Sequence, residues 1–379
     1  MMKLSNDIIR LFKLFNNSGY QLYIIGGAVR DYLLNREICD YDFATNATPN
    51  EMMKLLKDYN LDTYQSDLGS IKVHLNNQIY EITTFRKEYG VKDYRYPEKI
   101  EYIQDLKEDV IRRDFTINSL AYSLNDGVVD HLNGLSDLKL KLIKFNKDIK
   151  LSILEDPIRI IRALRFSLLL NFNILDADLS VMILHADRIN NLGKIKYDEL
   201  LKLFKIKGCK EFIIKYFNIY KKAYPFFDND IFINILNSNI VEEDLKYCLG
   251  YFVADLNYFN KHDMKILKAL NDIDICCNDL YRSKLLMIEY KDDLIKILDI
   301  LSSMGKDVSK IKDNVILVKN EKHCLDISGL DISYKDLENL NINVKEYSKI
   351  FKYLLNKVLI DYQLNTNEKL IELIKRGDY

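Results

Sequence analysis

Two aspartates separated by one residue are the first candidates for chemistry in this chain. Asp40 and Asp42 flank Tyr41 in a short run expected to be extended, where residues two apart project to the same face. Two carboxylates at one point repel each other unless cations lie between them. Carboxylates are ligands that Mg²⁺ accepts, and two Mg²⁺ ions about 3.5–4 Å apart suit a displacement at phosphorus. An isolated Asp-x-Asp pattern is usually structural, so the surrounding segments decide its meaning.

A paired-glycine turn precedes the two aspartates. Leu22 to Ile25 is predicted to be a strand, and it runs into Gly26 and Gly27 and then into a helix that carries Arg30 in its first turns. Glycines let a backbone approach an anion closely, and N–H groups at a helix start together with Arg30 suit phosphate oxygens. Asn35, after this helix, is expected in the left-handed conformation. The order of turn, helix and acid pair therefore predicts a phosphate-transfer site.

Further charged residues follow this turn. Glu81 lies in a predicted strand that we expect beside Asp42, as a third catalytic acid, and an ordinary ion pair with a neighbouring Arg or Lys is its alternative role. Arg113 is placed to reach a triphosphate or a sugar. Asp114 is expected either in the site or, as a structural alternative, capping the apolar helix predicted to follow it.

A regular charged pattern occurs later in the chain. Asp156, Arg159, Arg162 and Arg165 recur every three residues, which predicts a slowly drifting stripe on one helix. Such a stripe is normally a solvated ladder of salt bridges. A carboxylate at Asp156, however, can accept from the exocyclic amine of cytosine or adenine while Arg159 donates to the ring nitrogen. Uracil and guanine reverse both contacts, so this pair is able to select C and A together.

The elements that must position these residues change in type along the chain. The first 140 residues contain strand patterns such as Ile71 to Leu75 and Ile79 to Thr84, mixed with helical ones. After about Lys141 the apolar residues recur every three or four positions, for example from Leu200 to Tyr220 and from Val344 to Leu364. The sequence therefore predicts an α/β unit followed by helices.

Composition limits the class of protein. The chain has 379 residues, of which 48% are hydrophobic and 29% charged, as in soluble globular proteins of more than one domain. It lacks an apolar run of 18 residues, so we expect a cytoplasmic location and no membrane partner. The net charge is only -1, but lysines concentrate in residues 139–150 and 193–222. Each of these segments is either a solvated helix face or a surface suited to an RNA partner.

The six cysteines show no metal-binding spacing. They are Cys39, Cys209, Cys248, Cys276, Cys277 and Cys324. We expect them to be reduced and mostly buried, and this expectation includes the adjacent pair, for which a redox role is the alternative.

Taken together, four motifs closely resemble those of the class II tRNA nucleotidyltransferases, which comprise the bacterial CCA-adding enzymes and their poly(A) polymerase relatives. The motifs are Gly-Gly-Ala-Val-Arg-Asp from Gly26, the Asp40/Asp42 pair, Arg-Arg-Asp-Phe-Thr-Ile-Asn from Arg112, and Glu-Asp-Pro-Ile-Arg-Ile-Ile-Arg-Ala-Leu-Arg-Phe from Glu155. The resemblance is strong through about Phe172 and thinner beyond, although Leu325 to Lys375 resembles the family's tail.

The resemblance implies an α+β protein with four parts. A polymerase-β-like nucleotidyltransferase head, a mixed sheet with helices, would span residues 1–140. An all-α neck (141–200), body (201–320) and tail (321–379) would follow, with base recognition in the neck and RNA binding in the body and tail. A monomer or a homodimer is expected.

The same likeness implies a chemistry and a role for each matching residue. The 3′ hydroxyl of an RNA would attack the α-phosphate of CTP or ATP with two Mg²⁺ ions, and pyrophosphate would leave. The implied roles are Asp40 and Asp42 as metal ligands with Glu81 as third acid, Gly26, Gly27, Arg30 and Arg113 at the sugar or triphosphate, Asp156 and Arg159 as base readers, and Arg162 and Arg165 as further nucleotide contacts. The basic segments would hold the acceptor arm of tRNA through its phosphates.

Some features separate the members of this family. Many relatives have His-Gly-Thr where this chain has Leu68-Gly69-Ser70, and Ser119 replaces a common Ala. A loop in residues 87–99 favours an enzyme able to add A, so full CCA addition is the prediction, with A-only addition or poly(A) synthesis as alternatives. Two weaker hypotheses are a retired transferase that only binds RNA and a phosphohydrolase site at His262-Asp263.

Overall fold

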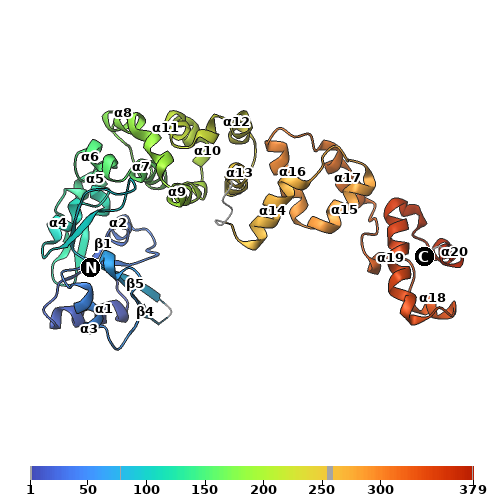
Figure 1. The fold of residues 1–379 in the computed structure, drawn as a ribbon, viewed down its shortest axis with the longest axis horizontal. Coiled ribbons are helices and arrows are strands. Elements are labelled where there is room, and N and C mark those ends of the chain that lie inside the picture. Colours follow the sequence, from blue (N-terminus) through green and yellow to red (C-terminus); the bar gives the residue numbers. More distant parts are fainter. Residues whose placement is uncertain (1, 77, 254–258, 378) are drawn as a thin grey trace. The chain divides into compact units, whose positions relative to one another are not determined.

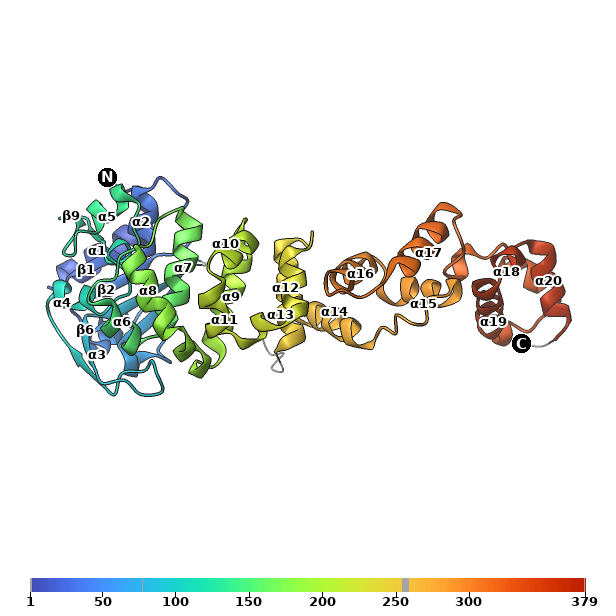
Figure 2. The same ribbon diagram turned by 90° about the horizontal axis from the view of Figure 1, so that it is seen from above.

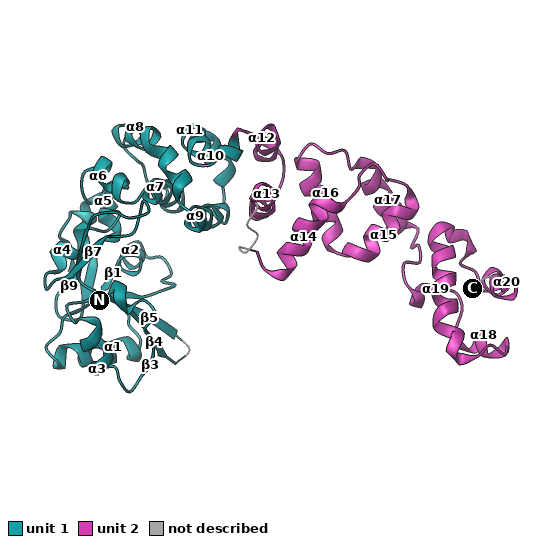
Figure 3. Cartoon of the chain, in the orientation of Figure 1, with its two compact units in different colours: residues 1–227 teal, residues 228–379 magenta. Residues whose placement is uncertain are grey.

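The computed structural model describes residues 2–76, 78–253, 259–377 and 379. The chain separates into two compact units, residues 1–227 and 228–379 (Figure 3). The boundary between the units falls inside the predicted body segment, and the four-part division stays a prediction. All strands of the described residues belong to the first unit, which also carries the candidate site (Figure 1).

A seven-stranded mixed sheet is the centre of the first unit. Its order is β3-β4-β5-β2-β1-β8-β9, in which β2 and β5 are parallel and the other neighbours antiparallel. The strands are β1 (Leu22–Ile25), β2 (Asp42–Thr45), β3 (Asn60–Asp62), β4 (Ser70–Leu75), β5 (Gln78–Thr84), β8 (Ala121–Ser123) and β9 (Gly127–Val129), and a separate pair is formed by β6 (Arg86–Tyr89) and β7 (Lys99–Tyr102). The predicted strands β1, β4 and β5 are confirmed.

Strand alternation gives this sheet two different faces. Phe43 packs edge-on against Phe12 of α1 (Asn6–Asn17) and against Tyr80, so one face is closed by aromatic side chains. On the other face Ala44 joins a buried cluster with Val110 of α4 (Leu106–Ile111). Asp42 and Ala44 share a face because they are two residues apart in the same strand. The carboxylate therefore projects on the side opposite Phe43.

The remaining helices of the first unit extend it beyond the sheet. They are α2 (Gly27–Leu33), α3 (Pro49–Leu55), α5 (Gly134–Leu140), α6 (Ile149–Glu155), α7 (Ile158–Leu170), α8 (Asp176–His185), α9 (Lys194–Phe204), α10 (Cys209–Lys215) and α11 (Phe217–Ala223), with 3₁₀ turns η1 (Ser66–Leu68), η2 (Thr116–Asn118), η3 (Ala186–Asn191) and η4 (Pro225–Asp228). Helix α7 packs against α9, and α9 to α11 follow it away from the sheet (Figure 2). Helix α7 thus connects the sheet region to the later helices of the unit.

Helices make up the second unit. They are α12 (Asp230–Asn237), α13 (Leu245–Phe252), α14 (Lys261–Asp272), α15 (Leu280–Tyr290), α16 (Asp293–Ser303), α17 (Ser309–Asn320), α18 (Tyr334–Asn339), α19 (Tyr347–Ile360) and α20 (Asn367–Lys375), with 3₁₀ turns η5 (Glu242–Asp244), η6 (Ile327–Gly329), η7 (Val344–Glu346) and η8 (Tyr362–Leu364). Leu337, Ile350, Leu354 and Leu370 join its last three helices in one apolar cluster. A mixed sheet with helices followed by helices alone confirms the predicted α+β class. No helix in the described ranges is both long and apolar enough to cross a lipid bilayer.

The helical pattern from Leu200 to Tyr220 is divided among α9, α10 and α11, and Gly208 adopts φ +83° between α9 and α10. Two local expectations need correction. The segment after Asp114 forms the short turn η2 and then β8 instead of an apolar helix. Cys276 and Cys277 are exposed, as is Cys39, because the adjacent pair lies in the connection between α14 and α15.

Candidate active site

Sheet register places two of the predicted acids side by side. Asp42 is the first residue of β2, and its direct partner in the parallel pair with β5 is Glu81. Directly paired residues project from the same face, so the two carboxyl groups lie together. Asp40 lies two residues before Asp42, outside the strand and exposed to solvent. Asn35, before them, has φ +53° as predicted, which ends the turn after α2.

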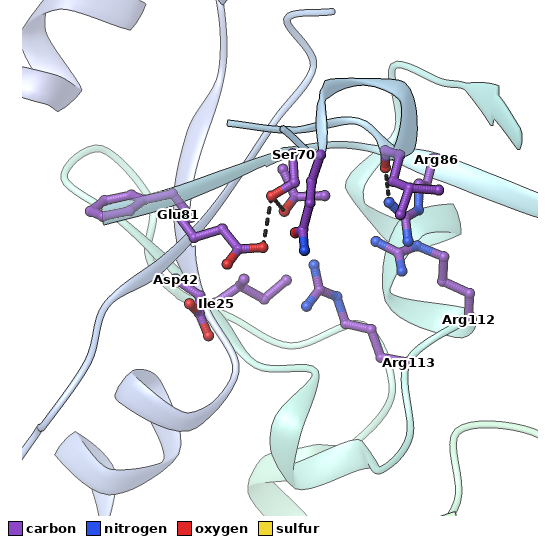
Figure 4. A pocket seen from close by; sticks show the side chains of 11 residues that line it. Ile25, Asp42, Ser70, Glu81, Arg86, Arg112 and Arg113 are labelled. Atoms are coloured by element: carbon purple, nitrogen blue, oxygen red, sulfur yellow. Dashed lines mark hydrogen bonds between the residues drawn. The ribbon is translucent and has the colours of Figure 1, made fainter. Parts of the chain in front are cut away.

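A cavity of about 300 Å³ opens at these acids. Its lining residues are Ile25, Asp42, Phe43, Gln65, Leu68, Ser70, Glu81, Thr83, Arg86, Arg112 and Arg113. Asp42 and Glu81 lie on one side of it and the three arginines on the other (Figure 4). A cavity with carboxylates facing guanidinium groups suits a ligand that brings both a cation and an anion, such as a metal-bound phosphate.

The pKa of Asp42 is raised by its surroundings in the cavity. Loss of surrounding water is the main cause that raises the pKa of Asp42, although its side chain still meets solvent along the cavity. The negative charge of Glu81 raises this pKa further, Arg113 opposes the increase, and Asp40 adds to it. The ionised Asp42 therefore lacks a full complement of positive charge, which a bound cation would provide.

The donor set fits Mg²⁺ better than a transition metal. The cavity lining holds carboxylates, and neither His nor Cys is among its described residues. No three His, Cys, Asp or Glu side chains in the described part of the chain form a ready-made metal cage. Mg²⁺ commonly uses one or two carboxylates and completes its shell with water and substrate phosphates, so Asp40 and Asp42 fit it without such a cage.

Glu81 takes a neutral partner in the folded chain. Its Oε1 accepts a hydrogen bond of 2.7 Å from the hydroxyl of Ser70, which lies on the neighbouring strand β4. Within the residues that the structure describes, Glu81 forms no ion pair. The bond to Ser70 fixes the carboxyl at the cavity wall and leaves its charge uncompensated. The ion-pair alternative for Glu81 is therefore not the arrangement that we observe.

A buried acid that the sequence analysis did not single out orients the arginine side of the cavity. Asp109 of α4 is fully buried and binds Arg112 at 2.8 Å and Arg113 at 2.9 Å. Burial would raise the pKa of Asp109, but the charges of Arg113 and Arg112 outweigh it and lower this pKa. The available signal was the spacing: Arg112 and Arg113 follow Asp109 by three and four residues, and a helical turn at the end of α4 brings the acid next to both arginines.

The paired glycines and Arg30 lie beside the cavity and do not line it. Gly26 has φ +79°, and its N–H donates to the carbonyl of Leu120 at 3.0 Å, which joins the turn to the region before β8. Arg30 is buried and donates to Asp31 at 2.8 Å and 2.9 Å and to Asn118 at 2.6 Å. In the folded chain the donors of Arg30 are taken by α2 and by η2, and the expected grip of Arg30 on phosphate stays a prediction.

Asp156 and Arg159 also take separate partners. Asp156 is an extended residue between α6 and α7, so it does not lie on the helix that carries the arginines. Its Oδ2 is 3.6 Å from Nε of Arg95, which belongs to the loop between β6 and β7. Arg159 is buried and donates to Ser152 at 2.6 Å and to the carbonyl of Arg112 at 2.6 Å. No salt bridge joins the two predicted base readers among the described residues.

The rest of the predicted stripe forms ion pairs. Arg162 binds Asp114 at 2.7 Å, and Arg165 binds Glu199 of α9 at 2.7 Å. Asp114 also accepts from the backbone N–H of Phe115 at 2.8 Å, so it braces the turn that follows it. Burial would raise the pKa of Glu199, but Arg165 and then Arg162 lower it below its usual range. These ion pairs are largely buried, unlike the solvated ladder that was the structural alternative for the stripe. The expected nucleotide contacts of Arg162 and Arg165 stay a prediction.

The His262-Asp263 dipeptide does not form a metal site. His262 is largely exposed, whereas Asp263 is buried and accepts from Lys246 at 2.7 Å and from the hydroxyl of Tyr247 at 2.8 Å. Its partners are a cation and a phenol, and the described chain offers no cluster of metal ligands around it. The phosphohydrolase hypothesis therefore has no structural support.

Comparison with known proteins gives consistent matches. A model of the poly A polymerase head domain matches residues 22–144. The chain is 31% identical over 373 residues to the CCA-adding enzyme of Staphylococcus saprophyticus, with 89% of each chain covered. It is 43% identical over 164 residues to the CCA-adding enzyme of Lactobacillus gasseri, a match that spans 43% of this chain and only 41% of that enzyme.

Solved structures show a similar fold. The Thermotoga maritima CCA-adding enzyme complexed with tRNA(CCA) superposes with a TM-score of 0.67 at 19% identity, covering 99% of this chain and 97% of that one. At this level of identity the likeness concerns the fold.

Proposed function

Because the chain belongs to the family of CCA-adding enzymes, we propose that it adds CCA to the 3′ end of tRNA. The nucleotides come from CTP and ATP, and each addition releases pyrophosphate. The observation that supports this proposal is the register of β2 with β5, which sets Asp42 beside Glu81 across a cavity from Arg113. The proposed addition is template-independent, with the base chosen by protein side chains.

Each addition is a displacement at phosphorus. The 3′ hydroxyl of the RNA gives up its proton to solvent as its oxygen forms a bond to the α-phosphorus. The bond from that phosphorus to the bridging oxygen breaks, and pyrophosphate leaves with the bonding electrons. Mg²⁺ held by Asp40 and Asp42 would supply charge stabilisation at the phosphate oxygens. Arg113, fixed by Asp109, is suited to the negative charge that develops on the leaving phosphates. Glu81 is the third acid of the site.

Base selection is the role that we propose for Asp156 and Arg159. In the folded chain Asp156 is paired with Arg95, and Arg159 with Ser152 and Arg112. A cytosine or adenine must therefore take over contacts that these side chains already make within the protein. The contact from Arg95 supports A addition as part of the product, because it ties the predicted residue 87–99 loop to the proposed base reader.

The decisive experiment compares the wild-type chain with Asp42→Ala on a tRNA that ends before CCA. We expect the wild type to build CCA with CTP and ATP together, and sequencing of ends made with CTP alone, ATP alone and both separates CCA from A-only or poly(A) synthesis. Asp42→Ala should reduce incorporation by about a thousandfold, because the charge stabilisation at phosphorus is lost. The control Asp58→Ala, at another exposed aspartate, should keep full activity.

Two results would contradict the proposal. One is extension by Asp42→Ala at the wild-type rate while its circular dichroism and melting temperature are unchanged. The second is a wild-type chain that binds tRNA with Mg²⁺ and both nucleotides present and adds no nucleotide, the behaviour expected of a retired transferase.

A further inference from the structure

Charged residues continue from the catalytic acids toward the edge of the sheet. Asp42 of β2 pairs with Glu81 of β5, Glu81 pairs with Lys72 of β4, and Lys72 pairs with Asp62 of β3. Residues that are direct partners project from the same face, so these four side chains form one row across four strands. Strand β3 is the edge of the sheet. The row therefore leads from the reacting centre to the outside of the unit.

Tyr64 stands at the outer end of this row. Its side chain is 92% exposed, the highest fraction among the large hydrophobic residues of the described chain. Its backbone is fixed, since the N–H of Tyr64 donates to Oδ1 of Asp62 at 3.0 Å. The exposed face of this aromatic ring does not stabilise the fold, because it contacts solvent instead of another side chain. That face is available to a ligand.

A small hollow connects Tyr64 to the catalytic cavity. Asp62, Tyr64, Gln65, Ser70 and Lys72 line it, and its volume is about 40 Å³. Gln65 and Ser70 also line the large cavity, so the two spaces are neighbours. The hollow holds little more than a water-sized group, such as a phosphate oxygen or a hydroxyl. A base therefore has to lie on the outer face of Tyr64.

Lys72 is a cation for which the described part of the chain offers no bonded partner. It is half-buried between Glu81 and Asp62, yet among the described residues it makes neither a hydrogen bond nor an ion pair. Partly buried charges are normally paired, so a free ammonium group here is a feature that a bound anion would satisfy. Phosphate is the anion that a nucleic-acid strand brings to such a group.

We propose that Tyr64 and Lys72 bind the 3′ end of the RNA, an inference that rests on the proposed function. The ring of Tyr64 stacks on a base of the terminal nucleotides, and Lys72 binds the adjoining phosphate. The nucleoside triphosphate and the RNA end must both reach the acids, and they need different routes to them. The glycine turn and Asp156, the residues proposed for the nucleotide, lie on the side of β1 and α7. The opposite side of the sheet, at the β3 edge, is left for the RNA strand. Aromatic stacking with a nearby cation is the usual chemistry of single-strand binding.

The test separates RNA binding from nucleotide binding. Tyr64→Ala should raise the KM for tRNA lacking CCA about tenfold, within the range for loss of one stacked base, and leave the KM for CTP unchanged. Tyr64→Phe keeps the ring and should behave as wild type. Lys72→Met should lower the slope of log affinity against log salt by about 0.7, the value for one phosphate contact on a single strand. Ile79→Ala, at a residue 57% exposed in the same sheet, is the control.

A binding measurement makes the inference independent of catalysis. A tRNA with 2-aminopurine as its last base should lose fluorescence on binding to the wild type and to Tyr64→Phe, because stacking quenches it, but not on binding to Tyr64→Ala. Equal quenching and equal KM for tRNA in Tyr64→Ala and wild type would overturn the inference. If the wild type quenches the probe but adds no nucleotide, the proposed function fails while the binding role of Tyr64 stands.

Discussion

Asp42 holds its charge at an electrostatic cost to the folded chain. Partial burial and the neighbouring Glu81 raise its pKa, so the folded state binds a proton at Asp42 more tightly than the unfolded chain does. The ionised form consequently destabilises the fold at neutral pH. This destabilisation disappears as the pH falls below the ordinary pKa of an aspartate. Functional residues commonly destabilise the fold as long as their ligand is not bound.

The sign of this effect predicts the behaviour of Asp42→Asn. In metal-free buffer the variant should melt at a higher temperature than the wild type at pH 7, and this advantage should vanish near pH 4 and below. Mg²⁺ at 100 times its dissociation constant should stabilise the wild type by about 2.7 kcal/mol, because it binds only the folded state. Asp42→Asn should show little of this shift, and Asp58→Asn should show all of it. An equal Mg²⁺ shift in all three chains would rule out Asp42 as a metal ligand.

Features that depend on neighbouring residues could be predicted from the sequence, whereas the detailed contacts between residues far apart in the chain could not. The strand from Leu22 to Ile25 and the left-handed Asn35 were predictable because local sequence decides them. The proximity of Asp42 and Glu81 was expected, but its register came only from long-range pairing. The partners of Arg30 and Arg159 were not predictable, because five donors on a flexible side chain can meet any acceptor that the fold brings near.

Among the elements, α7 and α9 are held together by charge as well as by apolar packing. Glu199 of α9 is only 3% exposed and is shared by Arg165 at 2.7 Å, Lys202 at 2.8 Å and Arg162 at 3.6 Å. Sequence periodicity predicted the helix but not this acid, because Glu199 lies on a different element from the arginines. These ion pairs fix α7, and with it the position of Asp156, which lies two residues before that helix.

Removal of the shared acid should destabilise this pair of helices strongly. We expect Glu199→Ala to lower the free energy of unfolding by about 3–5 kcal/mol, because the largely buried guanidinium group of Arg165 stays behind without its acid partner, whereas Arg162 keeps Asp114. Lys202→Ala, which removes a partner whose side chain is 55% exposed, should cost about 1 kcal/mol or less. Urea unfolding followed by circular dichroism measures both. An equal loss of unfolding free energy in the two variants would show that Glu199 does not hold the two helices together.

On the scale of the whole molecule, the distribution of charge matters more than its sum. Acidic and basic residues nearly cancel, with 55 Lys and Arg against 56 Asp and Glu. The lysines of residues 139–150 nevertheless include exposed side chains such as Lys139 and Lys150, for which the described chain shows no ion pair. A nearly neutral protein can therefore present a basic surface to an RNA backbone.

This uneven distribution of charge predicts that the lysines of residues 139–150 contribute to the salt dependence of tRNA affinity. Replacing Lys139 and Lys150 by Ala should reduce the slope of log affinity for tRNA against log salt by about 2, because two phosphate contacts are lost. The pair Lys54→Ala and Lys57→Ala, also exposed but outside the basic segments, should leave the slope unchanged. Filter binding over a series of KCl concentrations gives both slopes. Equal slopes for both double variants would show that residues 139–150 do not face the RNA.

The row from Asp42 to Asp62 also sets a limit on how this sheet can change in evolution. Its four charges share a face only while β3, β4, β5 and β2 keep their register. Deleting one residue within β5 would shift the strand by one position, turn Glu81 to the aromatic face and bring a neighbour such as Ile82 to the cavity. A substitution at one position of the row changes one contact. An insertion or deletion in one of these strands, in contrast, turns its charged residue to the other face and so separates Asp42 and Glu81 from the residues proposed to bind RNA. We therefore expect natural variation in these strands to spare their length even where it alters their side chains.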